Sequence, residues 1–242
     1  MDQEPILSEA TEAEATKSIG WVWRAVIALV ALIVVGFLAY PFIQEQPRNS
    51  DQSNAEGASE AQASIAAPEA TARANPDSAE AQFELGNAYV QTRQWEQAAA
   101  AYQRAIELDP NYQAAYANLG VVYYQQERLD LAASQYKKAL ELNPDDGEVA
   151  YNLGALYLQQ ALLSGGQPDP ELLDQAIAQL QQAQELAPDL AEPNFSLGVA
   201  YAALNQRDKA IEAFETFLKL DTGQDPRASQ EAESHLQTLR GE

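Results

Sequence analysis

The chain contains no cysteine and only one histidine among its 242 residues. The absence of cysteine excludes disulfide bonds, thiolate metal sites and a cysteine nucleophile. His235 has no second histidine or cysteine with which to build a site, so we expect it to be a surface or packing residue. Gly165-Gly166 follows no predicted strand and precedes no lysine, which excludes a phosphate-binding loop. We therefore expect no enzyme activity, no metal and no cofactor.

Basic side chains are also scarce. The 14 lysines and arginines face 36 aspartates and glutamates, which gives a formal net charge of −22. A nucleic-acid partner requires a basic face, so we expect none. The acidic surplus is either a solvated surface or a face toward a basic partner.

One long apolar segment lies near the N-terminus. Residues 25–40 contain no charge and no strongly polar side chain, and flanking aromatic residues extend the segment to residues 19–43. A membrane-spanning helix needs about 20 apolar residues. We predict a single transmembrane helix over residues 19–43, after an acidic tail over residues 1–18. A cleaved signal peptide is the alternative, but the leader is long and acidic and no small-x-small cleavage site follows.

The orientation of this predicted span depends on few charges. Lys17 and Arg24 lie on the N-terminal side of the uncharged run 25–40, and Arg48 is the only base close behind it. The positive-inside rule then favours, by one base, a single-pass membrane protein whose main domain lies outside the cytoplasm, in a periplasm or lumen. Residues 44–75 are polar or alanine-rich with few large apolar side chains, so we expect a flexible linker.

A pattern that returns after 34 residues dominates the rest of the chain. Each unit has a leucine-glycine pair, a tyrosine three residues later, an alanine, a large apolar residue and, in three units, a proline. The best example is Leu119-Gly120, Tyr123, Ala132, Tyr136, Ala139 and Pro144. Small residues at fixed positions allow two helices to pack closely, and each proline ends the second helix. The units cover about 79–112, 113–146, 147–190 and 191–224.

This pattern resembles the tetratricopeptide repeat (TPR) signature. The resemblance implies an all-α fold: a right-handed α-solenoid of four helix pairs over residues 76–225, which acts as a binding scaffold. The third unit carries ten extra residues with a loop at 164–170, where Pro170 should begin the second helix. Residues 226–242 should form a capping helix and tail, with Ala228, Ala232, Leu236 and Leu239 on one face.

In TPR stacks the first helix of each pair lines the concave face, which implies a peptide-binding groove in this chain. The candidate groove residues are Phe83, Asn87, Asn118, Val121, Tyr124, Tyr151, Asn152, Leu158 and Phe195. The asparagines either hydrogen-bond the backbone of an extended peptide or support helix packing.

Some family members grip a C-terminal carboxylate with asparagines and basic residues. Asn87 and Asn118 fall where those asparagines lie, but the basic positions hold Phe83, Glu148 and Asn152. Without cations a carboxylate would be repelled, so we do not expect this clamp. The sequence therefore predicts a membrane-anchored adaptor that binds a peptide segment or small subunit, in assembly or maintenance of a membrane protein complex. The alternative is a self-associating structural protein that pairs through Tyr112, Tyr116 and the exposed side of the helix predicted over residues 226–240, and the oligomeric state stays open.

Overall fold

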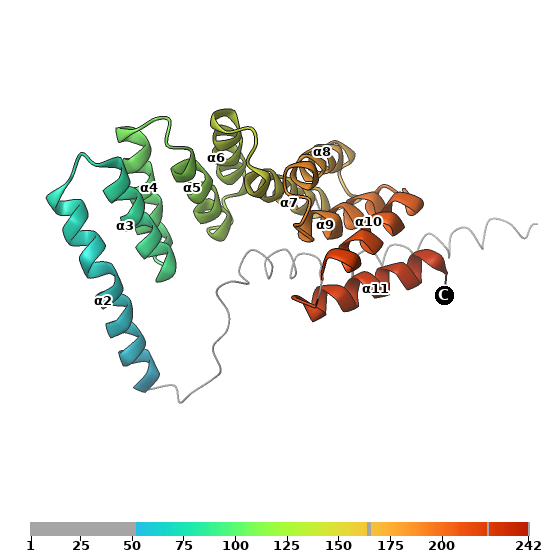
Figure 1. The fold of residues 1–242 in the computed structure, drawn as a ribbon, viewed down its shortest axis with the longest axis horizontal. Helices are drawn as coiled ribbons and strands as arrows, with labels where there is room; N and C mark the ends of the chain where they lie inside the picture. The colour runs from blue at the N-terminus through green and yellow to red at the C-terminus, as the bar shows by residue number, and fades with distance from the viewer. Residues whose placement is uncertain (1–51, 164–165, 222, 242) are drawn as a thin grey trace, which may run out of the picture.

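The computed structural model describes residues 52–163, 166–221 and 223–241, and within these ranges every regular element is an α-helix. Successive helices stack in order along the chain, from α2 at one end to α11 at the other (Figure 1). The predicted all-helical solenoid is confirmed. The helices are α2 (Gln52–Ala74), α3 (Ala79–Gln91), α4 (Trp95–Leu108), α5 (Gln113–Gln125), α6 (Leu129–Leu142), α7 (Gly147–Leu163), α8 (Pro170–Leu186), α9 (Glu192–Ala203), α10 (Arg207–Leu220) and α11 (Pro226–Arg240).

Four antiparallel pairs form the body of the stack: α3 with α4, α5 with α6, α7 with α8, and α9 with α10. The second helices of the first three pairs end at Leu108, Leu142 and Leu186, two residues before a proline in each case. Proline has no amide proton and restricts the residue before it, so the helix cannot continue.

The repeated glycines pack against side chains of the paired helix. A Cβ atom on Gly86 would lie 2.5 Å from the ring of Tyr102, and one on Gly120 would lie 2.6 Å from the ring of Tyr136. A Cβ atom on Gly198 would lie 2.7 Å from the ring of Phe214. We expected these glycines to bring two backbones together. In these three pairs they instead make room for a large aromatic ring, which is at most 1% exposed.

The insertion in the third pair has the predicted form. The first helix, α7, continues to Leu163, and α8 begins at Pro170. Asp169 accepts hydrogen bonds from the backbone amides of Glu171 and Leu172, which are otherwise unpaired at the start of a helix. Helix α7 has 17 residues, whereas the other first helices have 12 or 13. Helix α8 also has 17 residues, whereas the other second helices have 14.

The predicted capping helix is also confirmed. Helix α11 begins after Asp225, which accepts hydrogen bonds from the amides of Arg227 and Ala228. Its apolar face packs on α10, and a last, half-buried contact comes from Leu239. The fully buried residues of this face are Ala228, Ala232 and Leu236.

The predicted flexible linker over residues 44–75 differs from the structure, which has helix α2 over Gln52–Ala74. Its C-terminal half packs on α3, where Ile65 is 1% exposed and the Tyr89 hydroxyl donates a hydrogen bond to Glu69. The sequence favoured a linker because Pro68 lies inside this segment and its large apolar residues are few. Burial against α3 compensates for both.

None of the described helices combines the length and apolar character that crossing a membrane requires. This finding contradicts the predicted localisation, a single-pass membrane protein with its repeats outside the cytoplasm. Such a span needs about 20 consecutive apolar residues, whereas even the longest described helix, α2, contains Glu69 and Arg73. The segment 19–43, on which the prediction rested, and the tail 1–18 lie outside the described residues.

Candidate functional site

We call the surface presented by the first helices of the four pairs, α3, α5, α7 and α9, the groove face. These helices contain only four charged residues, Glu80, Glu84, Glu148 and Glu192, and α5 contains none. Each second helix contains three or more. Three of the four glutamates lie in the first helical turn, where the helix dipole stabilises a negative charge. The middle of the groove face is therefore almost uncharged.

The structure divides the candidate groove residues into two groups. Three are in the core: Leu158 is 1% exposed, Phe195 is 5% exposed and Tyr124 is 6% exposed. The other six are half-buried, so part of each side chain meets solvent. They are Phe83, Asn87, Asn118, Val121, Tyr151 and Asn152.

The burial of Phe195 has a clear cause. Its ring meets Phe214 and Phe217 edge to face, with ring centres 5.6 Å and 5.2 Å apart. Phe217 occupies the position that is alanine in the other three repeats. Leu158 is covered because α7 is longer than the other first helices and also contacts α9. Neither side chain presents a surface to a partner.

Asn87 and Asn118 belong to a hydrogen-bond network within the protein. The hydroxyl of Tyr102, on α4, donates to Oδ1 of Asn87 over 2.7 Å, and the amide of Asn118 donates to the same oxygen over 3.1 Å. Burial raises the pKa of Tyr102, so the hydroxyl stays protonated and can donate. This asparagine network joins the first two repeats, which favours the packing role for these two residues.

One repeat further along, the same network is incomplete. Val121 replaces the acceptor Asn87, and the buried hydroxyl of Tyr136 has no hydrogen-bond partner among the described residues. The hydroxyl of Tyr124 is also buried without a partner. Burial raises the pKa of Tyr124, Tyr136 and Tyr151, so all three hydroxyls stay protonated.

Asn152 differs from the other two candidate asparagines. It occupies the same repeat position as Asn118, but its amide makes no hydrogen bond to any residue in the described ranges. The side chain is half-buried, so it can exchange water for a partner's backbone groups. Among the three candidate asparagines, Asn152 is therefore the one whose amide is not already hydrogen-bonded to another described residue.

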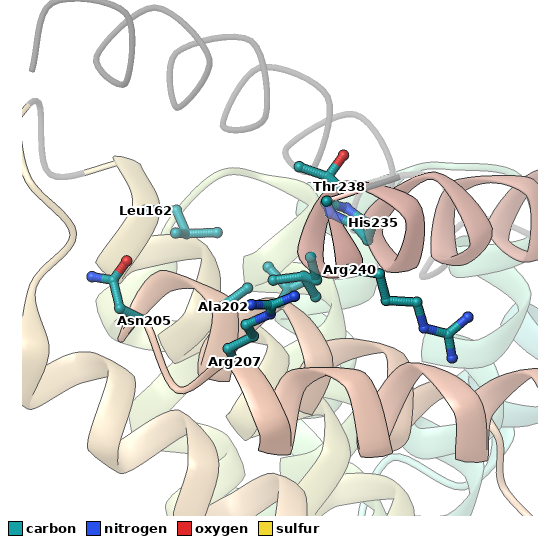
Figure 2. A pocket seen from close by; sticks show the side chains of 10 residues that line it. Leu162, Ala202, Asn205, Arg207, His235, Thr238 and Arg240 are labelled. Carbon is teal, nitrogen blue, oxygen red and sulfur yellow. The ribbon is translucent and has the colours of Figure 1, made fainter. Parts of the chain in front are cut away.

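A cavity of about 570 Å³ lies at the C-terminal end of the groove face, between α7, α9, the start of α10 and α11. The ring of His235, on α11, stacks on Phe214 with centres 4.9 Å apart, and burial lowers its pKa, so it is neutral at pH 7. Figure 2 shows the side chain of Arg207 extending into the space between the labelled residues, while Arg240 extends away from them. The lining residues are Leu162, Val199, Ala202, Asn205, Arg207, His235, Thr238, Leu239, Arg240 and Gly241.

The candidate residues chosen from the sequence do not line this cavity. Val199 and Ala202 are at the repeat positions that line the concave face, which is a signal that the sequence carried. The other walls come from α11 and from the extension of α7. Their arrangement depends on how the cap docks, which no repeat period specifies.

Comparisons with known proteins agree with this geometry. Profiles of the family described as tetratricopeptide repeat match residues 54–113, 83–147, 135–185 and 191–223. A search of curated proteins found no match.

Several solved structures have a similar fold. The crystal structure of MamA superposes with a TM-score of 0.60 at 21% identity, over 78% of this chain and 99% of that one. MamA from Desulfovibrio magneticus RS-1 superposes with a TM-score of 0.56 at 21% identity, over 73% of this chain and 98% of that one. Pseudomonas aeruginosa PilF superposes with a TM-score of 0.56 at 27% identity, over 67% of this chain and 69% of that one. At such identities the likeness to MamA concerns the fold alone.

Proposed function

Because this chain belongs to the tetratricopeptide repeat family, we propose that it is a non-catalytic scaffold that binds an extended segment of a protein partner along the groove face. Stacked helix pairs present a long continuous surface, and the chemistry of that surface selects the partner. The segment would lie across α3, α5 and α7 and leave the charged second helices in water.

The observation that carries this proposal is the near absence of charge on the groove face. Four glutamates are its only charged residues, and three of them lie at the N-terminal ends of their helices. Removing charged side chains from water is costly, so a surface with few of them is cheaper to cover. The half-buried residues Phe83, Val121 and Tyr151 can contact apolar side chains of a peptide.

The amide of Asn152, which has no hydrogen-bond partner among the described residues, supplies a polar contact that suits an extended backbone, since an amide group both donates and accepts. Self-association is the alternative drawn from the sequence. The ring of Tyr112, one of the residues named for it, packs on Phe83 with centres 4.9 Å apart, so the two proposals share part of their surface.

The proposal predicts different effects for two asparagines. Peptides selected from a random library against the full chain should bind an Asn152→Ala variant about 2- to 13-fold more weakly, because one hydrogen bond is worth about 0.5–1.5 kcal/mol. The unfolding transition of this variant should stay close to that of the wild type. An Asn118→Ala variant should lose stability, since Asn118 bonds Asn87 within the protein.

Gln175→Ala provides the matched control, because it removes an exposed amide from the second helix α8. Titration calorimetry with each selected peptide measures the change. Selected peptides that bind the Asn152→Ala and Gln175→Ala variants equally well would show that the groove face is not their binding surface.

A further inference from the structure

The cavity at the C-terminal end of the groove face differs in charge from the rest of the protein. The chain has a formal net charge of −22, yet the ten residues that line the cavity include two arginines and no aspartate or glutamate. The cavity therefore differs in sign from the strongly acidic chain, and electrostatic complementarity would favour a negatively charged group there.

The two arginines are not equivalent. Arg240 forms an ion pair with Glu215 of α10, so its charge is largely matched within the protein. Arg207, at the first position of α10, forms no ion pair with any residue that the structure describes. Its side chain extends into the space among the lining residues (Figure 2). Arg207 is therefore the cation that remains for a ligand, and its planar guanidinium suits a carboxylate.

The rest of the lining is mostly apolar. Leu162 and Val199 are buried, while Ala202 and Leu239 are half-buried. A volume of about 570 Å³ falls within the usual range for ligand pockets and accommodates a large side chain with its backbone. The walls thus favour an apolar group, and the rim favours an anion.

Val199 and Ala202 also belong to α9, one of the four helices of the groove face. The cavity therefore continues the surface along which the proposed function places an extended segment. An occupant that arrives along this surface is a stretch of peptide.

Resting on that proposed function, we propose that the cavity binds one end of the partner's segment, where a large apolar side chain is followed by an aspartate or glutamate. The apolar side chain enters between α7, α9 and α11, and the carboxylate accepts hydrogen bonds from the guanidinium of Arg207. A free C-terminal carboxylate is not needed.

The probes are acetylated and amidated fluorescent peptides in which leucine, phenylalanine or tryptophan precedes aspartate, asparagine or lysine. Fluorescence anisotropy with the full chain should show the aspartate peptides binding about 10-fold more tightly than the lysine peptides. Arg207→Glu should reverse this order. Arg227→Glu makes the same charge change at an exposed residue of α11 outside the cavity and should preserve the order.

A second pair of variants tests the apolar part. Thr238→Trp places a large ring at an exposed cavity position and should abolish binding, whereas Gln237→Trp adds the same ring on the neighbouring exposed residue outside the lining and should not. The proposal is overturned if aspartate and lysine peptides bind alike, if the order survives in Arg207→Glu, or if a fatty acid such as decanoate binds the cavity and the peptides do not.

These outcomes separate the cavity from the groove face. Peptides that bind the cavity variants normally but bind the Asn152→Ala variant more weakly would contradict the cavity assignment and leave the proposed function intact. Peptides whose binding is weakened by the cavity variants but not by Asn152→Ala would support the cavity assignment and contradict the proposed binding along the groove face.

Discussion

Replacing Phe214 by alanine should lower the free energy of unfolding by about 3–5 kcal/mol. Phe214 is 0% exposed and joins three helices: its ring meets Phe195 of α9 and stacks on His235 of α11, and it fills the space above Gly198. Removing the ring leaves a void that the surrounding helices can close only in part. A typical domain has a total stability of about 5–15 kcal/mol, so the loss is a large fraction.

Urea unfolding followed by circular dichroism measures this change. Leu163→Ala is the control, because Leu163 is 48% exposed and truncating it should cost well under 1 kcal/mol. Backbone amides of α11 should also exchange hydrogen faster in Phe214→Ala, since the cap loses a contact of His235. If the two alanine variants lose similar stability, the docking of the cap described above is incorrect.

Gly120→Leu should destabilise the protein by about 1–3 kcal/mol or more through overpacking. Even the Cβ atom would lie 2.6 Å from two ring carbons of Tyr136, a residue that is 1% exposed. The ring must shift and separate α5 from α6. Because each repeat is stabilised by its neighbours, the loss should spread to the first and third repeats.

Gly166→Leu is the matched control, since a Cβ atom there would meet nothing within 4 Å. Thermal unfolding should shift strongly for Gly120→Leu and little for Gly166→Leu. Hydrogen exchange that accelerates only in α5 and α6 would contradict the expected coupling between repeats.

The repeat architecture could be predicted because its signals are local and recur. Glycine, alanine and proline at fixed intervals mark where the paired helices contact and end, so the four helix pairs could be predicted, and the apolar face of residues 226–240 predicted the cap. Helix α2 was harder to predict. Its evidence lies in two tertiary contacts, the burial of Ile65 and the hydrogen bond from Tyr89 to Glu69, which no period reveals.

The candidate site could be predicted only in part. Repeat position selected residues on the first helices, but the exposure of each depends on its neighbours. Phe217 in place of alanine buries Phe195, and the pairing of Asn118 with Asn87 leaves Asn152 as the available amide. The cavity was missed because α11 must dock before its walls exist.

Site-specific photocrosslinking to a selected peptide tests the central claim, that the groove face is the binding surface, most directly. A photoreactive amino acid is placed at Val121 or Asn152 on the groove face, and at Ser134 or Gln175, which are exposed on the second helices α6 and α8. We predict peptide adducts at the two groove positions and only background at the other two. Adducts at Ser134 or Gln175, with none at Val121 or Asn152, would contradict the account.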